Sequence, residues 1–234
     1  MILGENGIKM GKRFPEFVVN PTDIVNEYGA DTLRLYEMFM GPLNADKPWS
    51  NEGVIGAKKF IDRVYRLFTE EDKVKDEPNK NLDKLYNQTV KKVTEDYESL
   101  NINTAISQMM IFVNAVNKED VLPREYAEGF IKLLNPLCPH ITEEIWHEKL
   151  GHKDTIAYEK WPTFDEKHLV EDEKDIGVQV NGKLRATITI NVNDDEETIK
   201  EKALKEENVI KNTEGKEIVK IIVIKGRIVN IVVK

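Results

Sequence analysis

Cysteine is almost absent from this 234-residue chain, because Cys138 is the only one. A single cysteine excludes an intrachain disulfide and a zinc site built on several thiolates, which favours a reducing, cytoplasmic setting. The chain also lacks an apolar run of membrane-spanning length, and it lacks the basic start and apolar stretch of a signal peptide. We therefore expect neither a membrane partner nor secretion.

Recognisable nucleotide and metal motifs are missing as well. The sequence contains no Gly-x-x-x-x-Gly-Lys-Ser/Thr phosphate loop and no Gly-x-Gly-x-x-Gly that opens a βαβ unit. Three histidines, His140, His147 and His152, are spaced by seven and five residues, so they cannot share one helical face. The sequence therefore predicts no metal site and no complete ATP site.

Positive charge is not in excess. The chain has 34 Lys and Arg against 42 Asp and Glu, a formal net charge of −8. An acidic total does not exclude an RNA partner, because affinity depends on where the cations lie. Residues 175–234 carry eleven Lys or Arg against ten Asp or Glu. The negative charge is therefore concentrated upstream of residue 175.

Apolar residues recur at three- and four-residue steps through much of the chain, which indicates amphipathic helices. The longer predicted helices cover residues 54–68, 82–100, 102–116, 124–134 and 139–151. Such helices bury their apolar stripes by packing on one another, so we expect an all-α antiparallel helical bundle over residues 23–164. The charged stretch 165–175 is expected to be a linker.

Beyond residue 175 the apolar period changes to two. Alternating segments at 176–180 and 184–190 flank Asn181-Gly182, which favours a hairpin with a type I′ turn. A helix over 198–207 and a second hairpin over 218–233 follow. The prediction for residues 176–234 is a small α+β domain built as hairpin, helix, hairpin.

Two sets of cations are candidates for contact with phosphates. Lys9 and Lys12 lie in a glycine-bearing loop, where fixed cations can stabilise charge that develops on phosphate oxygens. Others lie on a predicted helix of the bundle, or beside the two hairpin turns along one rim of the small domain. They are expected to meet RNA phosphates without reading bases. These RNA candidates are Arg63, Arg66, Lys183, Arg185, Lys225 and Arg227. The alternative for each is a solubilising surface charge.

Several segments together resemble one family. Residues 9–13, Lys-Met-Gly-Lys-Arg, are similar to the Lys-Met-Ser-Lys-Ser signature loop of class I aminoacyl-tRNA synthetases. Residues 18–21 (Val-Val-Asn-Pro) and 29–34 (Gly-Ala-Asp-Thr-Leu-Arg) resemble the segments that follow this loop. Residues 139–146 (Pro-His-Ile-Thr-Glu-Glu-Ile-Trp) and 178–183 (Val-Gln-Val-Asn-Gly-Lys) resemble the bacterial type of leucyl-tRNA synthetase.

The resemblance implies a C-terminal fragment of such an enzyme that is inactive in isolation. Residues 1–22 would be the signature-loop remnant of the catalytic domain, with Lys9 and Lys12 catalytic and Lys12 binding ATP. Gly11 and Arg13 depart from the family, which has serines there. The bundle would be the anticodon-binding-type domain, and residues 176–234 would be the C-terminal tRNA-binding domain.

The full-length enzyme would attach leucine to tRNA-Leu and would use ATP and Mg²⁺, while the fragment is expected to bind no cofactor. Its expected partners are tRNA-Leu and the missing catalytic and editing domains of the same protein, in a cytoplasmic monomer. Two alternatives stay open. One is a stand-alone, non-catalytic tRNA-binding module derived from a synthetase, and the other is a structural bundle without an RNA partner.

Overall fold

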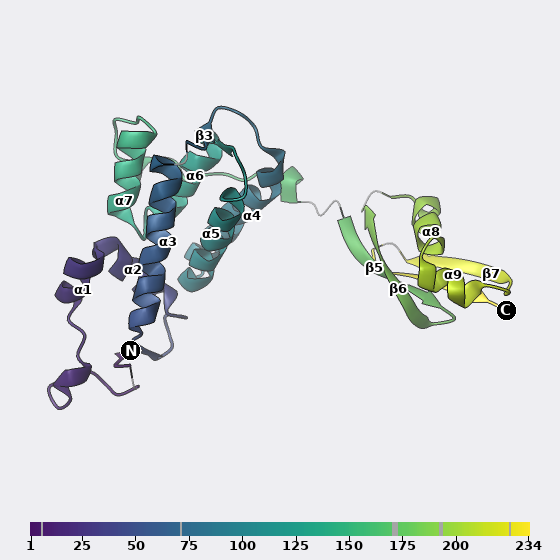
Figure 1. Cartoon of the computed structure of the whole chain (residues 1–234), viewed down its shortest axis with the longest axis horizontal. Helices are drawn as coiled ribbons and strands as arrows, with labels where there is room; N and C mark the ends of the chain where they lie inside the picture. The colour runs from purple at the N-terminus through teal and green to yellow at the C-terminus, as the bar shows by residue number, and fades with distance from the viewer. Residues whose placement is uncertain (6, 71, 170–172, 192–193, 225) are drawn as a thin grey trace. The chain divides into compact units, whose positions relative to one another are not determined.

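The computed structural model describes residues 1–5, 7–70, 72–169, 173–191, 194–224 and 226–234. The chain divides into two compact units (Figure 1). We call residues 1–169 the helical unit and residues 170–234 the small unit. Each unit has its own hydrophobic core. No helix in these described ranges is long and apolar enough to cross a membrane.

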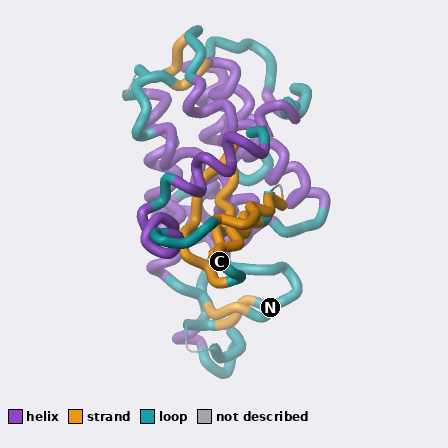
Figure 2. The backbone as a smooth tube through the Cα atoms, turned by 90° about the vertical axis from the view of Figure 1, so that its right-hand side faces the viewer, coloured by secondary structure: helices purple, strands orange, loops and turns teal. Residues whose placement is uncertain are grey.

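Helices form most of the helical unit. They are α1 (Pro21–Tyr28), α2 (Ala30–Phe39), α3 (Asn51–Thr69), α4 (Lys80–Glu98), α5 (Ile102–Val116), α6 (Arg124–Leu134) and α7 (Pro139–Glu144), with short 3₁₀ helices at Pro15–Phe17, Ile156–Tyr158 and Glu166–Leu169. Two pairs of short parallel strands are present, β1 (Ile2–Leu3) with β2 (Lys47–Pro48) and β3 (Val74–Lys75) with β4 (Leu122–Pro123). The two pairs lie at opposite ends of the unit (Figures 1 and 2).

Capping residues set several helix starts. The Ser50 hydroxyl accepts a hydrogen bond from the Gly53 amide at 3.1 Å, so α3 begins three residues before the apolar periodicity does. The end of the last helix also differs from the prediction. The α-helical part of α7 ends at Glu144 and continues as a π-helical turn at Ile145–Lys149. This wider turn buries the adjacent Ile145 and Trp146 together.

Aromatic rings fill the contact between α4, α5 and α6. Tyr86 stacks on Tyr126 with ring centroids 4.0 Å apart, and it meets Phe112 at 5.9 Å. Phe112 in turn contacts Phe130 at 5.4 Å. These residues come from three different helices and belong to one buried core, so the helices pack on one another as predicted.

The first half of the predicted linker, residues 165–175, belongs to the helical unit. Residues 166–169 form a 3₁₀ helix that packs on α4, and the Asp165 amide donates to the Asn87 side chain at 2.7 Å. The next strand then starts at residue 173. The connection is therefore shorter than residues 165–175, because a side chain of α4 holds its first residues.

The small unit is a four-stranded sheet with two helices. Its elements are β5 (Glu173–Val180), β6 (Lys183–Asn191), α8 (Glu196–Leu204), α9 (Glu207–Thr213), β7 (Ile218–Ile224) and β8 (Ile228–Val233). The strand order is β6-β5-β8-β7, in which each hairpin is antiparallel and the central pair β5/β8 is parallel. Asn181 and Gly182 have φ of 48° and 77°, the left-handed values that a type I′ turn requires.

The sequence predicts one helix over 198–207, but the structure has two. The backbone at Glu206 is extended, with φ −68° and ψ 127°, so α8 ends before it and α9 starts after it. Ile199 and Ala203, four residues apart, share the buried face of α8. Val209 is also fully buried, but it lies six residues after Ala203 and would leave that face in a continuous helix. The break turns Val209 into the core.

Candidate nucleic-acid interface and signature loop

The candidate signature loop is held by backbone contacts near β1. Leu3 and Lys9 form an isolated antiparallel β-bridge, and so do Gly11 and Phe14. The Met10 side chain packs against the helical core. Lys9 and Lys12 are exposed, and neither pairs with a carboxylate in the described part of the chain. The loop thus presents two free ammonium groups to solvent, as a phosphate-binding role requires.

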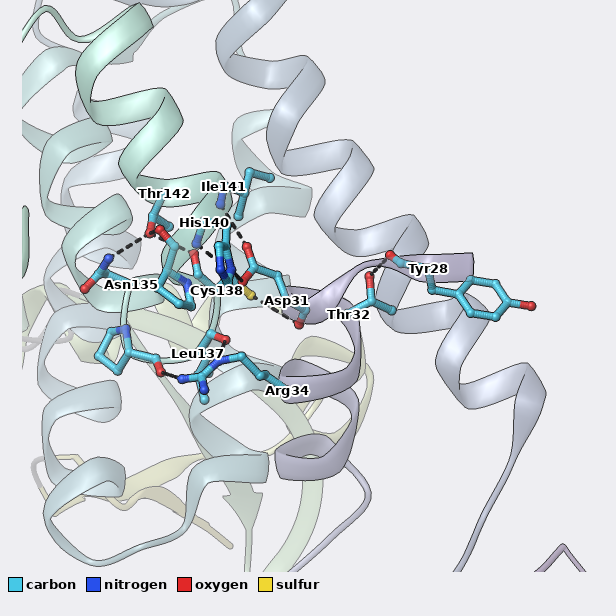
Figure 3. Close-up of polar contacts among 12 residues, drawn as sticks. Tyr28, Asp31, Thr32, Arg34, Asn135, Leu137, Cys138, His140, Ile141 and Thr142 are labelled. Atoms are coloured by element: carbon cyan, nitrogen blue, oxygen red, sulfur yellow. Dashed lines mark hydrogen bonds and ion pairs between the residues drawn. The ribbon is translucent and has the colours of Figure 1, made fainter. Parts of the chain in front are cut away.

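The Gly-Ala-Asp-x-Leu-Arg segment places a buried carboxylate beneath the start of α7 (Figure 3). Asp31 Oδ2 accepts from the Ile141 amide at 2.8 Å, and Asp31 Oδ1 lies 2.7 Å from Nδ1 of His140. The residue before α7, Cys138, makes no capping hydrogen bond through its side chain. Asp31 therefore caps α7 from another helix, 110 positions away in the chain.

Arg34, one turn later on α2, binds the turn between α6 and α7. Its guanidinium donates through Nε to the Leu137 carbonyl at 3.0 Å and through an Nη to the Pro136 carbonyl at 2.8 Å. These carbonyls follow α6, where helical partners are missing. Asp31 and Arg34 thus fasten α2 to both sides of one turn (Figure 3), and we call the pair the α2 latch.

The single cysteine belongs to this packed region. Cys138 is fully buried, with its sulfur 3.9 Å from the Asp31 carbonyl. Burial raises the pKa of the Cys138 thiol above its ordinary value of 9.0, and the negative charge of Asp31 raises it further. The thiol is therefore protonated at neutral pH, which suits a core residue and not a nucleophile.

The two arginines predicted on α3 have different environments. Arg63 is half-buried, and its Nη1 donates to the Asn114 side chain of α5 at 2.5 Å. Arg66 is exposed and forms no ion pair with any residue that the structure describes. Arg63 thus helps to join α3 to α5, whereas Arg66 is available to an external phosphate.

The candidates in the small unit do not share one rim. Lys183 follows the β5–β6 turn, and the amide of Asn181 in that turn donates to the Ile231 carbonyl near the end of β8. Arg227 precedes β8, at the other end of the same strand. Because β5 and β8 run parallel, a turn after one and a turn before the other lie at opposite ends.

Lys183, Arg185 and Arg227 are nevertheless all exposed. Lys225, the fourth candidate in the small unit, lies outside the described residues. Sequence reasoning also missed Lys220, an exposed cation on β7. The signal was present, because Lys220 alternates with Ile221 and Val223, which pack against the core.

Part of the chain matches a family of known domains. The model for the anticodon-binding domain of tRNA ligase matches residues 79–201, which is more than half of the chain. The chain belongs to this family. Its helical unit is accordingly a domain of the anticodon-binding type, followed by a small sheet domain, as the sequence predicted.

A solved structure extends the likeness to the whole chain. The agnB2 LeuRS of Agrobacterium radiobacter K84, crystallised in a ternary complex with tRNA and LeuAMS, is 29% identical to the chain with a TM-score of 0.81. The match covers 100% of this chain and 33% of that one, so the chain spans about a third of that protein's length. The resemblance to leucyl-tRNA synthetases is thereby confirmed.

Proposed function

We propose that this chain is the C-terminal, tRNA-binding part of a leucyl-tRNA synthetase that acts as a cytoplasmic monomer. The observation that carries the proposal is the match of the entire chain, at a TM-score of 0.81, to a LeuRS bound to tRNA. In the proposal the full enzyme attaches leucine to tRNA-Leu, and its catalytic and editing domains lie outside these 234 residues.

Lys9 and Lys12 are proposed to act on ATP when the catalytic domain is present, with Lys12 in direct contact. Both are exposed, and cations held beside a triphosphate stabilise the negative charge that develops on its oxygens. ATP, with Mg²⁺, supplies the phosphoanhydride that activates the amino acid. Gly11 and Arg13 replace two serines of the family loop, so Arg13 adds a third cation where hydroxyl donors are usual. Alone, the chain is proposed to form no leucyl-adenylate.

The tRNA contacts are assigned to exposed cations that form no ion pair with a described residue. Arg66 supplies one in the helical unit, and Lys183, Arg185 and Arg227 supply three in the small unit. Phosphate contacts of this kind position a nucleic acid without reading its bases. Arg63 acts less directly, because its guanidinium is committed to Asn114. Lys225 keeps its proposed role from the sequence alone.

Two measurements test the proposal. Fluorescence anisotropy with labelled tRNA-Leu, from about 50 to 200 mM salt, should show binding that weakens steeply as salt rises. Leucine-dependent ATP–pyrophosphate exchange should be undetectable with the same preparation. The variant with Lys9→Gln and Lys12→Gln is the control, because it should leave tRNA affinity unchanged. Absence of binding at low salt, or robust exchange, would contradict the proposal.

A further inference from the structure

Charge is divided between the two layers of the small unit. The lysines of α8 and α9 are engaged in ion pairs, which are Lys200–Glu197 at 2.7 Å, Lys202–Asp194 at 2.7 Å, Lys211–Glu207 at 3.1 Å and Lys205–Glu201 at 3.7 Å. On the strands and their turns, Lys183, Arg185, Lys220 and Arg227 are exposed, and none forms an ion pair with a described residue. These four cations, which have no ion pair to a described residue, therefore belong to the sheet layer.

The face of the sheet that α8 and α9 do not cover is apolar in its middle. Along β8, the buried Val229 and Ile231 alternate with Ile228, which is only partly covered. Ile228 is the register partner of Ile224 on β7 and of Gly177 on β5. Ile224 keeps 49% of its surface exposed. An apolar row thus crosses neighbouring strands on the open side.

A bulge adds Leu184 to this row. The register of β5 with β6 shifts so that Gln179 faces Leu184, and Arg185 becomes the extra residue. The Leu184 side chain lies over Gly177, because a Cβ built at Gly177 would be 2.8 Å from Leu184 Cδ1. Leu184 is 63% exposed. The missing side chain at position 177 lets a large apolar group lie flat on the sheet.

We infer that this surface, the open sheet face, is the part of the small unit that binds RNA. The open sheet face comprises Leu184, Lys220, Ile224 and Ile228, with Arg227 in the turn at the start of β8. Phosphates meet the cations at its two ends, and the flat side of an unstacked base or a ribose packs on the row between them. The inference rests on the proposed tRNA-binding function and adds which side of the unit makes the contact.

Geometry and charge both favour RNA as the occupant. Arg227 stands beside Ile228, while Lys220 is the register partner of Val232, four residues further along β8, or about 13 Å. Two cationic ends around an apolar centre suit a chain that carries phosphates on both sides of a base. An acidic amphipathic helix would need a groove, whereas this row is flat over Gly177. The acidic Asp175, on the same side, is bonded to Thr189 at 2.7 Å.

Paired variants of the whole chain test the cationic ends. The variant with Lys220→Gln and Arg227→Gln should weaken tRNA-Leu binding roughly tenfold near 0.1 M salt, and should reduce the slope of log affinity against log salt by about 1 to 2. The matched control carries Lys200→Gln and Lys205→Gln, the same charge change on the helix layer. That control should alter affinity by less than about twofold, because these lysines are already paired.

Two uncharged variants test the apolar row. Leu184→Ser should weaken binding severalfold with an unchanged salt slope, because no phosphate contact is lost. Gly177→Ala should act in the same direction, since the new methyl group displaces the Leu184 side chain. Far-UV circular dichroism checks that both variants fold, which the exposure of Leu184 favours.

The outcomes separate this inference from the proposed function. If the chain binds tRNA-Leu and all open-face variants bind equally well, the inference is wrong and the proposed function stands. If cation loss weakens binding but both uncharged variants bind normally, the role of the apolar row is overturned. Displacement of the RNA by polyglutamate at equal charge concentration would assign the face to acidic peptides instead. Absence of any binding at low salt overturns both.

Discussion

The helical unit and the small unit bury different kinds of side chain in their cores. Every Trp, Tyr and Phe of the chain lies within residues 1–169. The helical unit also buries polar side chains, among them Asp31, Asn87 and Thr142. The buried residues described in the small unit are exclusively Ile, Val and Ala. One core is aromatic and partly polar, and the other is wholly aliphatic.

The difference follows from how each architecture satisfies its backbone. A sheet pairs most of its amides and carbonyls through its own ladder, so its interior needs only side chains that pack. Every helix leaves unpaired amides at its start and unpaired carbonyls at its end. At the α6–α7 turn the α2 latch satisfies such groups from a distance, and one of them, the Ile141 amide, is buried. The burial of Asp31 is therefore a requirement of this turn.

Among the substitutions considered, one at Gly129, beside the aromatic core, should destabilise the protein most. A Cβ there would be 1.8 Å from the Tyr86 hydroxyl oxygen, so Gly129→Ala should cost about 3 kcal/mol of unfolding free energy through overpacking. Gly56, on the exposed side of α3, has nothing within 4 Å of the same position. Gly56→Ala should stabilise by about 0.5 to 1 kcal/mol through helix propensity. Urea unfolding followed by tryptophan fluorescence measures both, and effects of the same sign would contradict the packing argument.

The α2 latch provides the next largest effect. Asp31→Ala leaves the Ile141 amide buried without an acceptor, which should destabilise the helical unit by about 2 kcal/mol. Asp31→Asn keeps one oxygen acceptor and should recover part of this loss. Because all tryptophans lie in the helical unit, fluorescence-detected urea unfolding reports on it alone. Equal losses for the two variants would show that Asp31 does not act as a cap.

Alkaline pH should destabilise the helical unit and not the small unit, without any mutation. Burial is the main cause that raises the pKa of Tyr86 and Tyr97 above their ordinary value of 10.0, and that of Cys138 above 9.0. The folded state keeps these protons after the unfolded state has lost them, so the stability that they contribute is complete below pH 9 and falls as pH rises above it. Each group should then cost on the order of 1 kcal/mol per pH unit.

The small unit provides the control in the same experiment, because residues 170–234 contain no tyrosine or cysteine. Fluorescence at pH 10 to 12 should therefore report unfolding of the helices, while the amide exchange of β5 and β8 keeps its protection relative to its intrinsic rate at each pH. Loss of protection in both units at the same pH would contradict the separation.

The smallest expected effect concerns the surface of the small unit. Lys205 and Glu201 form a 3.7 Å pair in which both side chains are more than two-thirds exposed. Lys205→Ala should therefore change the unfolding free energy by less than about 0.5 kcal/mol. Hydrogen exchange of the β5 amides measures this change. A larger loss would mean that ion pairs, and not only aliphatic packing, stabilise the small unit.

Local sequence signals accounted for most of the fold. The apolar stripes of α3 to α6 report burial directly, so periodicity located them, and Asn181-Gly182 located its turn because few residues accept left-handed φ. The break at Glu206 was not predictable from propensity, since Lys and Glu are ordinary helix residues. The break allows Val209 to pack in the core, and this is a tertiary contact that local propensity does not encode.

The site was less accessible to sequence reasoning. Asp31 and Arg34 were visible as a motif, but their partners lie more than 100 positions away and carry no local signal. The sequence predicts both hairpin turns on one rim, because each turn is a local signal that does not indicate how the two hairpins pair. The parallel pairing of β5 with β8 joins distant segments and places those turns at opposite ends.

This central pairing also determines the order in which the small unit can be built. Asn181 and Val233 exchange hydrogen bonds although they are 52 positions apart in the chain. During synthesis, the helical unit, the first hairpin and both helices are made before β8. Closing so long a loop must precede any gain from the pairing, so we expect the sheet to assemble late and more slowly than its hairpins. Until β8 arrives, the nascent chain carries one edge of β5 unpaired, and a chaperone or another nascent strand can occupy it.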